Sequence, residues 1–126
     1  MFNARSVKNK LADFYEIIYN NAYDCIFVTE TWLNDDLPSS LLDPEGLFNV
    51  YRYDRCDRTG GGVCCLILKR FRVVQMSVDL ECSYSNVVSL VLLTDNVSYK
   101  FILIYRPPLC NADGLEDALK LHTVID

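Results

Sequence analysis

Near the N-terminus, apolar side chains recur every three or four residues. This spacing predicts an amphipathic helix that starts near Ser6, a candidate N-cap, and ends near Asn20. The apolar positions are Val7, Leu11, Phe14 and Ile18. Only residues 1–3 precede the helix, and we interpret them as the very end of a first strand that begins upstream.

A second pattern, an unbroken apolar run, follows after a short link. Cys25–Val28 does not alternate between apolar and polar residues, which predicts a strand over residues 24–29 that is buried on both faces. Glu30 would then emerge at the C-terminal edge of this strand, where α/β proteins place their chemistry. On pattern alone, Glu30 is either a solvent-facing strand end or an oxygen ligand for Mg²⁺.

The rest of the chain is rich in predicted strands. Residues 34–46 are polar and carry two prolines, so a surface loop with one helical turn at 39–42 is expected. Further strands are predicted at 48–53, 63–68, 71–78, 87–93 and 99–105, and a final helix begins near residue 113. Asp95-Asn96 provides turn chemistry for a hairpin. This order favours an α/β sandwich with mixed, largely antiparallel sheets over a doubly wound parallel sheet.

Composition narrows the possibilities. The 126 residues are 51% hydrophobic, which suits one domain or part of one. The net charge of −5 gives no general attraction to nucleic acid, so any phosphate contact must be local. Three of the six cysteines lie in apolar runs, which favours reduced thiols, and the single histidine with no CxxC pair excludes a typical zinc site. No signal peptide or membrane-spanning run is present, so an intracellular chain is expected.

Four segments in order carry a resemblance to a known family. They are Asn3–Leu11, Thr29–Leu33, Arg58–Val63 and Tyr105–Pro108. Together they resemble the endonuclease/exonuclease/phosphatase domain, in the version found at the front of the reverse transcriptase polyprotein of non-LTR (LINE-like) retrotransposons. The resemblance spans nearly the whole chain.

The resemblance implies a four-layer α/β/β/α sandwich and Mg²⁺-dependent cleavage of phosphodiester bonds in DNA. By their positions in the family motifs, Asn3 matches an asparagine that hydrogen-bonds within the active site and Glu30 matches the metal-binding glutamate. Tyr105 matches the tyrosine whose hydroxyl lies close to the scissile phosphate. We further infer from its charge that Arg106 contacts a phosphate oxygen.

The chain also departs from the family pattern. The family's later Gly-Asp-x-Asn segment, its Asp and its Asp-His pair do not occur in these 126 residues. We therefore interpret the chain as an N-terminal fragment that is inactive alone. A phosphatase or exonuclease of the same superfamily and a non-catalytic relic or binding module, associating through exposed sheet edges, are the alternatives. Nuclear localisation would follow if the parent is an active retrotransposon protein.

Several residues have a simpler structural interpretation. Asn3 suits a helix N-cap and Tyr105 suits a buried strand aromatic. We interpret Trp32 as a hydrophobic plug over the strand end rather than a base-stacking platform. Gly60–Gly62 lacks the residues of a P-loop and is expected to be a turn into a strand. The basic residues, which we expect on solvated faces of edge strands rather than in a DNA-facing patch, are Arg52, Arg55, Arg58, Lys69, Arg70 and Arg72.

Overall fold

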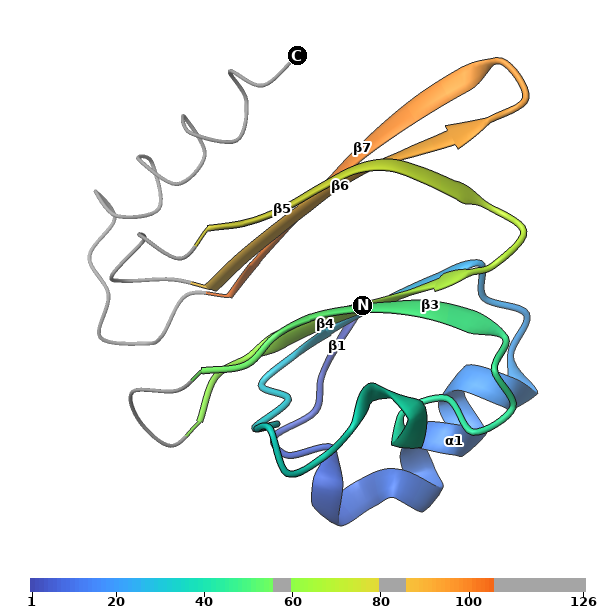
Figure 1. Cartoon of the computed structure of the whole chain (residues 1–126). Helices are drawn as coiled ribbons and strands as arrows, with labels where there is room; N and C mark the ends of the chain where they lie inside the picture. Colours follow the sequence, from blue (N-terminus) through green and yellow to red (C-terminus); the bar gives the residue numbers. More distant parts are fainter. Residues whose placement is uncertain (56–59, 80–85, 106–126) are drawn as a thin grey trace.

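A computed structural model of the chain describes residues 1–55, 60–79 and 86–105. The strands form two sheets that lie face to face, and the helices cover the outer face of the first sheet (Figure 1). In chain order the elements are β1 (Phe2–Asn3), η1 (Lys8–Lys10), α1 (Leu11–Asn20), β2 (Cys25–Thr29), η2 (Ser39–Leu41), β3 (Phe48–Tyr53), β4 (Val63–Leu68), β5 (Arg72–Asp79), β6 (Asn86–Thr94) and β7 (Val97–Tyr105).

The first sheet is mixed and has the strand order β1-β2-β4-β3. Strand β1 runs parallel to β2, with Phe2 opposite Val28 and Asn3 opposite Thr29. Strand β4 lies between β2 and β3 and is antiparallel to both. The parallel pairing brings the C-terminal ends of β1 and β2 to the same edge of the sheet, next to Glu30.

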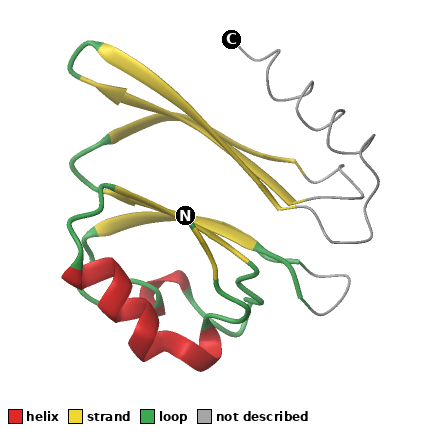
Figure 2. Ribbon diagram, turned by 180° about the vertical axis from the view of Figure 1, so that it is seen from behind, coloured by secondary structure: helices red, strands yellow, loops and turns green. Residues whose placement is uncertain are grey.

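The second sheet is an antiparallel meander, β5-β6-β7. Asn86 pairs with Tyr105 at one end, and Thr94 pairs with Val97 at the turn. The predicted hairpin and its turn residues are confirmed. Figure 2 shows this sheet against the first one, on the side away from α1.

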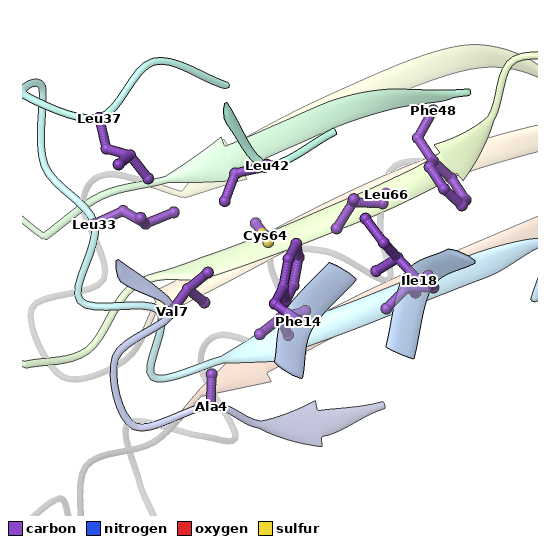
Figure 3. Packing of buried hydrophobic residues seen from close by; sticks show 12 residues of the cluster. Ala4, Val7, Phe14, Ile18, Leu33, Leu37, Leu42, Phe48, Cys64 and Leu66 are labelled. Atoms are coloured by element: carbon purple, nitrogen blue, oxygen red, sulfur yellow. The ribbon is translucent and has the colours of Figure 1, made fainter. Parts of the chain in front are cut away.

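Two hydrophobic clusters hold the layers together. In the first, Phe14 and Ile18 of α1 pack onto Leu66 and the neighbouring residues of the first sheet (Figure 3). In the second, Ile67 of the first sheet and Leu90 of the second sheet belong to one buried cluster. Strand β4 contributes to both clusters, and its residues from Val63 to Ile67 are fully buried. Burial on both faces explains why this strand shows no alternation in sequence.

The α/β fold class is confirmed, with one mixed and one antiparallel sheet. The second helical layer of a four-layer sandwich would include the helix predicted near residue 113, which lies outside the described residues. The Ser6 cap prediction is wrong. Ser6 is buried with φ 81°, and a 3-10 turn precedes α1, which has no side-chain cap. The three described cysteines, Cys25, Cys64 and Cys65, are free thiols in strands, as predicted.

A hydrogen-bonded cluster fixes the loop after η2 to helix α1. Asp43 is buried, and its carboxylate accepts hydrogen bonds from the Tyr19 hydroxyl and the Phe48 backbone N–H, both at 2.7 Å. The Glu45 backbone N–H donates to the Tyr19 oxygen at 3.0 Å. Burial, and then the hydrogen bond to Asp43, raise the pKa of Tyr19 to about 12.

Arg52 fixes a different segment, the loop between β2 and η2. Its guanidinium pairs with Asp54 through Nε–Oδ1 (2.9 Å) and Nη2–Oδ2 (2.5 Å). It also donates to the carbonyls of Leu37 (2.7 Å) and Asn34 (2.9 Å). The Arg52 side chain is only 14% exposed, so the prediction of a solvated face is wrong for this residue. A planar group with five donors can bind a carboxylate and two carbonyls at once.

Candidate functional site

The parallel pairing of β1 and β2 continues beyond the ends of both strands. The Ala4 N–H donates to the Thr29 carbonyl, and the Ser6 N–H donates to the Glu30 carbonyl, each at 2.9 Å. The next such bond joins Val7 to Thr31 at 3.0 Å. These bonds, rather than a helix cap, account for the positive φ of Arg5 (46°) and Ser6 (81°). They also place the exposed Arg5 on the segment beside Glu30.

On its other side, the segment after β2 is bound to the glycine turn that precedes β4. Trp32 N–H donates to the Gly61 carbonyl at 3.0 Å, and Thr31 N–H donates to Gly62 at 3.3 Å. Both Glu30 (φ 57°) and Trp32 (φ 53°) are in the left-handed region. This conformation costs a non-glycine residue roughly 1–2 kcal/mol, and such strain is concentrated at functional sites. Gly60–Gly62 is a turn into a strand, as predicted.

The half-buried Glu30 carboxylate is held by donors from three parts of the chain. Its Oε1 accepts a hydrogen bond from the Tyr105 hydroxyl, at the end of β7. Its Oε2 accepts bonds from the Trp32 indole N–H and, at 3.3 Å, from the Gly61 backbone N–H. The contact with Tyr105 joins the two sheets across 75 positions of sequence. Glu30 is therefore an oriented carboxylate and not a freely solvated strand end.

Asn3 lies at the same edge of the first sheet, but the structure does not bring its side chain into this hydrogen-bonded group. Phe2 packs on Phe14 of helix α1, with 6.2 Å between the ring centroids. Because successive strand residues point to opposite faces, Asn3 is exposed on the face toward the second sheet. Its alternative role as an N-cap of α1 is wrong, since eight positions separate it from Leu11, where α1 begins.

The plug interpretation of Trp32 is also wrong, because its side chain is 47% exposed. Sequence reasoning missed that Trp32 and Gly61 both donate to the predicted metal ligand. The available signal was a lone tryptophan two residues after the glutamate, together with a glycine run before a strand. Neither feature reveals a hydrogen bond between distant segments.

The other basic residues of the prediction fall into two groups, those that the structure describes and those that lie outside the described residues. Lys69, Arg70 and Arg72 are exposed as predicted, and Arg70 forms an ion pair with Asp24. Arg58 and Arg106 lie outside the described residues, so the inferred phosphate contact of Arg106 stays a prediction.

Glu30 suits the role of a single carboxylate ligand for Mg²⁺. This ion is commonly bound by one or two carboxylates, with waters and substrate phosphates completing its shell. Among the described residues, Oε1 accepts a hydrogen bond from Tyr105, and a carboxylate oxygen has a second lone pair that can bind a cation. No group of three or more His, Cys, Asp or Glu side chains suited to a metal occurs in the described part of the chain. Glu30 would therefore supply one ligand and not a complete cage.

Comparison with known proteins adds no assignment. A scan against protein-family models and a search of curated proteins both find no match. Within the described ranges, no helix has the length and apolar character needed to cross a membrane.

Proposed function

We propose that this chain carries the first part of the catalytic site of a Mg²⁺-dependent DNA endonuclease domain, of the kind found in retrotransposon polyproteins. The observation that supports the proposal most is the hydrogen bond from Tyr105 to Glu30. The sequence resemblance assigns both residues to one site, and they come from different sheets. A packing role for Tyr105 alone does not require its hydroxyl to reach this carboxylate.

In this proposal, each residue has a distinct task. Glu30 would hold Mg²⁺, which when bound neutralises charge that develops on a phosphoryl group. The Tyr105 hydroxyl and the Gly61 N–H fix the direction of the carboxylate. Tyr105 would also lie beside the phosphate, and Asn3 would donate a hydrogen bond from the adjoining strand.

The proposal includes an expectation of low activity. The acids that activate water in the family belong to motifs that these 126 residues do not contain. Groups of a catalytic unit act together, so a partial set leaves little of the rate. We expect the 126-residue chain to nick supercoiled DNA in Mg²⁺ slowly or not at all.

Metal binding tests the proposal independently of turnover. Mn²⁺ is a suitable probe, since its free and bound forms are distinguished by electron paramagnetic resonance and Mg²⁺ competes for the same oxygen sites. We expect Glu30→Gln to weaken Mn²⁺ binding at least about tenfold, because a neutral amide replaces the anionic ligand. Glu16→Gln, at an exposed position of α1, is the matched control.

The possible results have clear meanings. Equal Mn²⁺ affinity in the Glu30→Gln variant and the parent chain would contradict the assignment of Glu30. Nicking that disappears in Glu30→Ala would support the endonuclease and overturn the expectation of low activity.

A second candidate, a non-catalytic binding module, is favoured by the apolar side chains exposed on the second sheet. These are Val74, Leu93, Val97 and Tyr99. The absence of Glu30-dependent Mn²⁺ binding would leave the exposed apolar side chains as the remaining evidence and would favour this candidate.

A further inference from the structure

We infer that the exposed indole of Trp32 is a stacking surface for a nucleobase of the DNA substrate. The inference rests on the proposed function and adds a substrate contact to it. Trp32 is the only tryptophan of the chain. It is 47% exposed although it lies two residues from the candidate metal ligand. A tryptophan that served only the core would bury this apolar area.

Two hydrogen bonds fix the position of Trp32, one from its indole ring and one from its backbone. Its indole N–H donates to Glu30 Oε2, and its backbone N–H donates to the Gly61 carbonyl at 3.0 Å. A hydrogen atom of Gly60 faces the indole nitrogen, since a Cβ there would lie 3.7 Å away. The polar atom of the ring is therefore already bonded. What remains for a ligand is the exposed apolar area of the residue, which is suited to a flat apolar group.

The backbone around Trp32 directs this side chain outward. Thr31 and Leu33 are both buried, with 0% and 3% exposure. Trp32 has φ 53°, a left-handed conformation that is uncommon for a bulky residue. The chain thus accepts local strain while it presents an aromatic ring to solvent beside Glu30. A strained residue that holds a side chain in place is a typical sign of a binding site.

Charge and position together favour a nucleobase. If Glu30 holds the metal on a phosphate, the base attached to the neighbouring sugar lies within reach of Trp32. The net charge of −5 disfavours the binding of a polyanion. Local contacts must offset this repulsion, and stacking is well suited because it does not depend on charge. Stacking also tolerates every base, since each has a π face.

Intrinsic fluorescence tests the inference directly, because all of the tryptophan signal comes from Trp32. The chain is titrated, without metal, with a thymidine oligonucleotide and with an oligomer of the same length built from abasic sites. Both oligomers have the same phosphodiester backbone. We expect the thymidine oligomer to quench the emission in a saturable way and the abasic oligomer to quench it little and bind at least about fivefold more weakly. Equal quenching by both oligomers, or no quenching by either, would overturn the inference.

Two variants separate stacking from simple packing. Trp32→Leu keeps an apolar side chain without a π face and is expected to weaken binding of a labelled thymidine oligomer about fivefold to a hundredfold. Trp32→Phe keeps a π face and should lose less than Trp32→Leu. Tyr23→Leu, at another exposed aromatic (50%), is the control and should bind as the parent does. Circular dichroism and thermal unfolding establish that each variant is folded. Equal binding by the Leu variant and the parent would contradict the stacking role.

This test and the metal test can fail separately. Quenching by the thymidine oligomer is recorded without metal and Mn²⁺ binding is recorded without DNA, so neither measurement depends on the other. Loss of base-dependent quenching with Glu30-dependent Mn²⁺ binding intact would overturn only the Trp32 inference. Base-dependent quenching with Mn²⁺ binding that does not need Glu30 would uphold stacking and overturn the metal assignment.

Discussion

The Thr31 hydroxyl oxygen lies 2.5 Å from the position that a Cβ atom at Gly62 would take. Gly62 also has φ +86°. A side chain here would meet both a buried atom and an unfavourable backbone conformation. We expect Gly62→Ala to lower the free energy of unfolding by at least about 2 kcal/mol, the sum of left-handed strain and overpacking. Urea unfolding measures this change.

Gly46→Ala is the control for Gly62→Ala. Gly46 has a similar positive φ of +68°, but the nearest atom to its Cβ position is Lys69 Nζ at 3.8 Å. Only the strain remains, so a loss of about 1 kcal/mol is expected. Equal losses in the two variants would show that the contact with Thr31 has no energetic effect.

Thr31→Val should raise stability. The Thr31 side chain is fully buried, and its Oγ1 has no hydrogen-bond partner in the described structure. An unpaired buried hydroxyl costs roughly 1–3 kcal/mol, and valine has almost the same shape without it. We expect a gain of about 1 kcal/mol in the free energy of unfolding. A loss in the valine variant would indicate that the hydroxyl has a partner.

Alkaline pH should weaken the attachment of the loop at Asp43 to helix α1. Folding raises the pKa of Tyr19 from 10.0 to about 12, through burial and the bond to Asp43. The folded state therefore favours the protonated phenol, and this stabilisation is complete below pH 10 and lost as pH rises through 12. Burial raises the pKa of Cys65 in the same direction, so the parent chain should lose stability over this range.

The contribution of Tyr19 is isolated by substitution. Tyr19→Phe should be less stable than the parent at pH 8, because Asp43 and the Glu45 N–H lose a partner. Its stability should then fall less steeply between pH 10 and 12. Tyr23→Phe, at an exposed position, is the control in denaturant melts at each pH. A Tyr19→Phe variant with the same alkaline slope as the parent would contradict this account.

Arg52→Lys should loosen the loop after β2 although the charge is kept. A lysine cannot reproduce the paired bonds to Asp54 together with those to the Leu37 and Asn34 carbonyls. We expect a loss of about 1–3 kcal/mol, measured by thermal unfolding. Arg72→Lys, on the exposed side of β5, should change stability by less than about 0.5 kcal/mol. An Arg52→Lys variant with the same stability as the parent would mean that charge alone fixes the loop.

Most strands could be predicted from the sequence, and the reason is local. The strands at 48–53 and 63–68 match residue for residue, because a glycine comes shortly before each segment and apolar or aromatic residues dominate both of them. The start of the first helix could not be predicted in this way. Ser6 has a good capping side chain, but its backbone pairs with Glu30 instead, and that pairing depends on a segment more than twenty residues away.

At the candidate site, too, contacts between distant segments could not be predicted from local sequence patterns. The resemblance assigns Glu30 and Tyr105 to one site, and the structure brings these two residues into contact. The exposure of Trp32 could not be predicted, because tryptophan is highly buried on average, whereas here Thr31 and Leu33 occupy the inward positions. Asn3 lies at the end of β1, as predicted, and backbone alternation directs its side chain away from helix α1.

The two sheets also differ in how far apart their strands lie in the sequence, and this has a kinetic consequence. Strands β5, β6 and β7 pair with their immediate neighbours, whereas β2 must find β4 across the long segment from residue 30 to 62. Short loops close faster than long ones, so we expect the meander to form first. Tyr105 would then be in place before Glu30 arrives, and assembly of the site becomes a late event in folding that reports on completion of the whole sandwich.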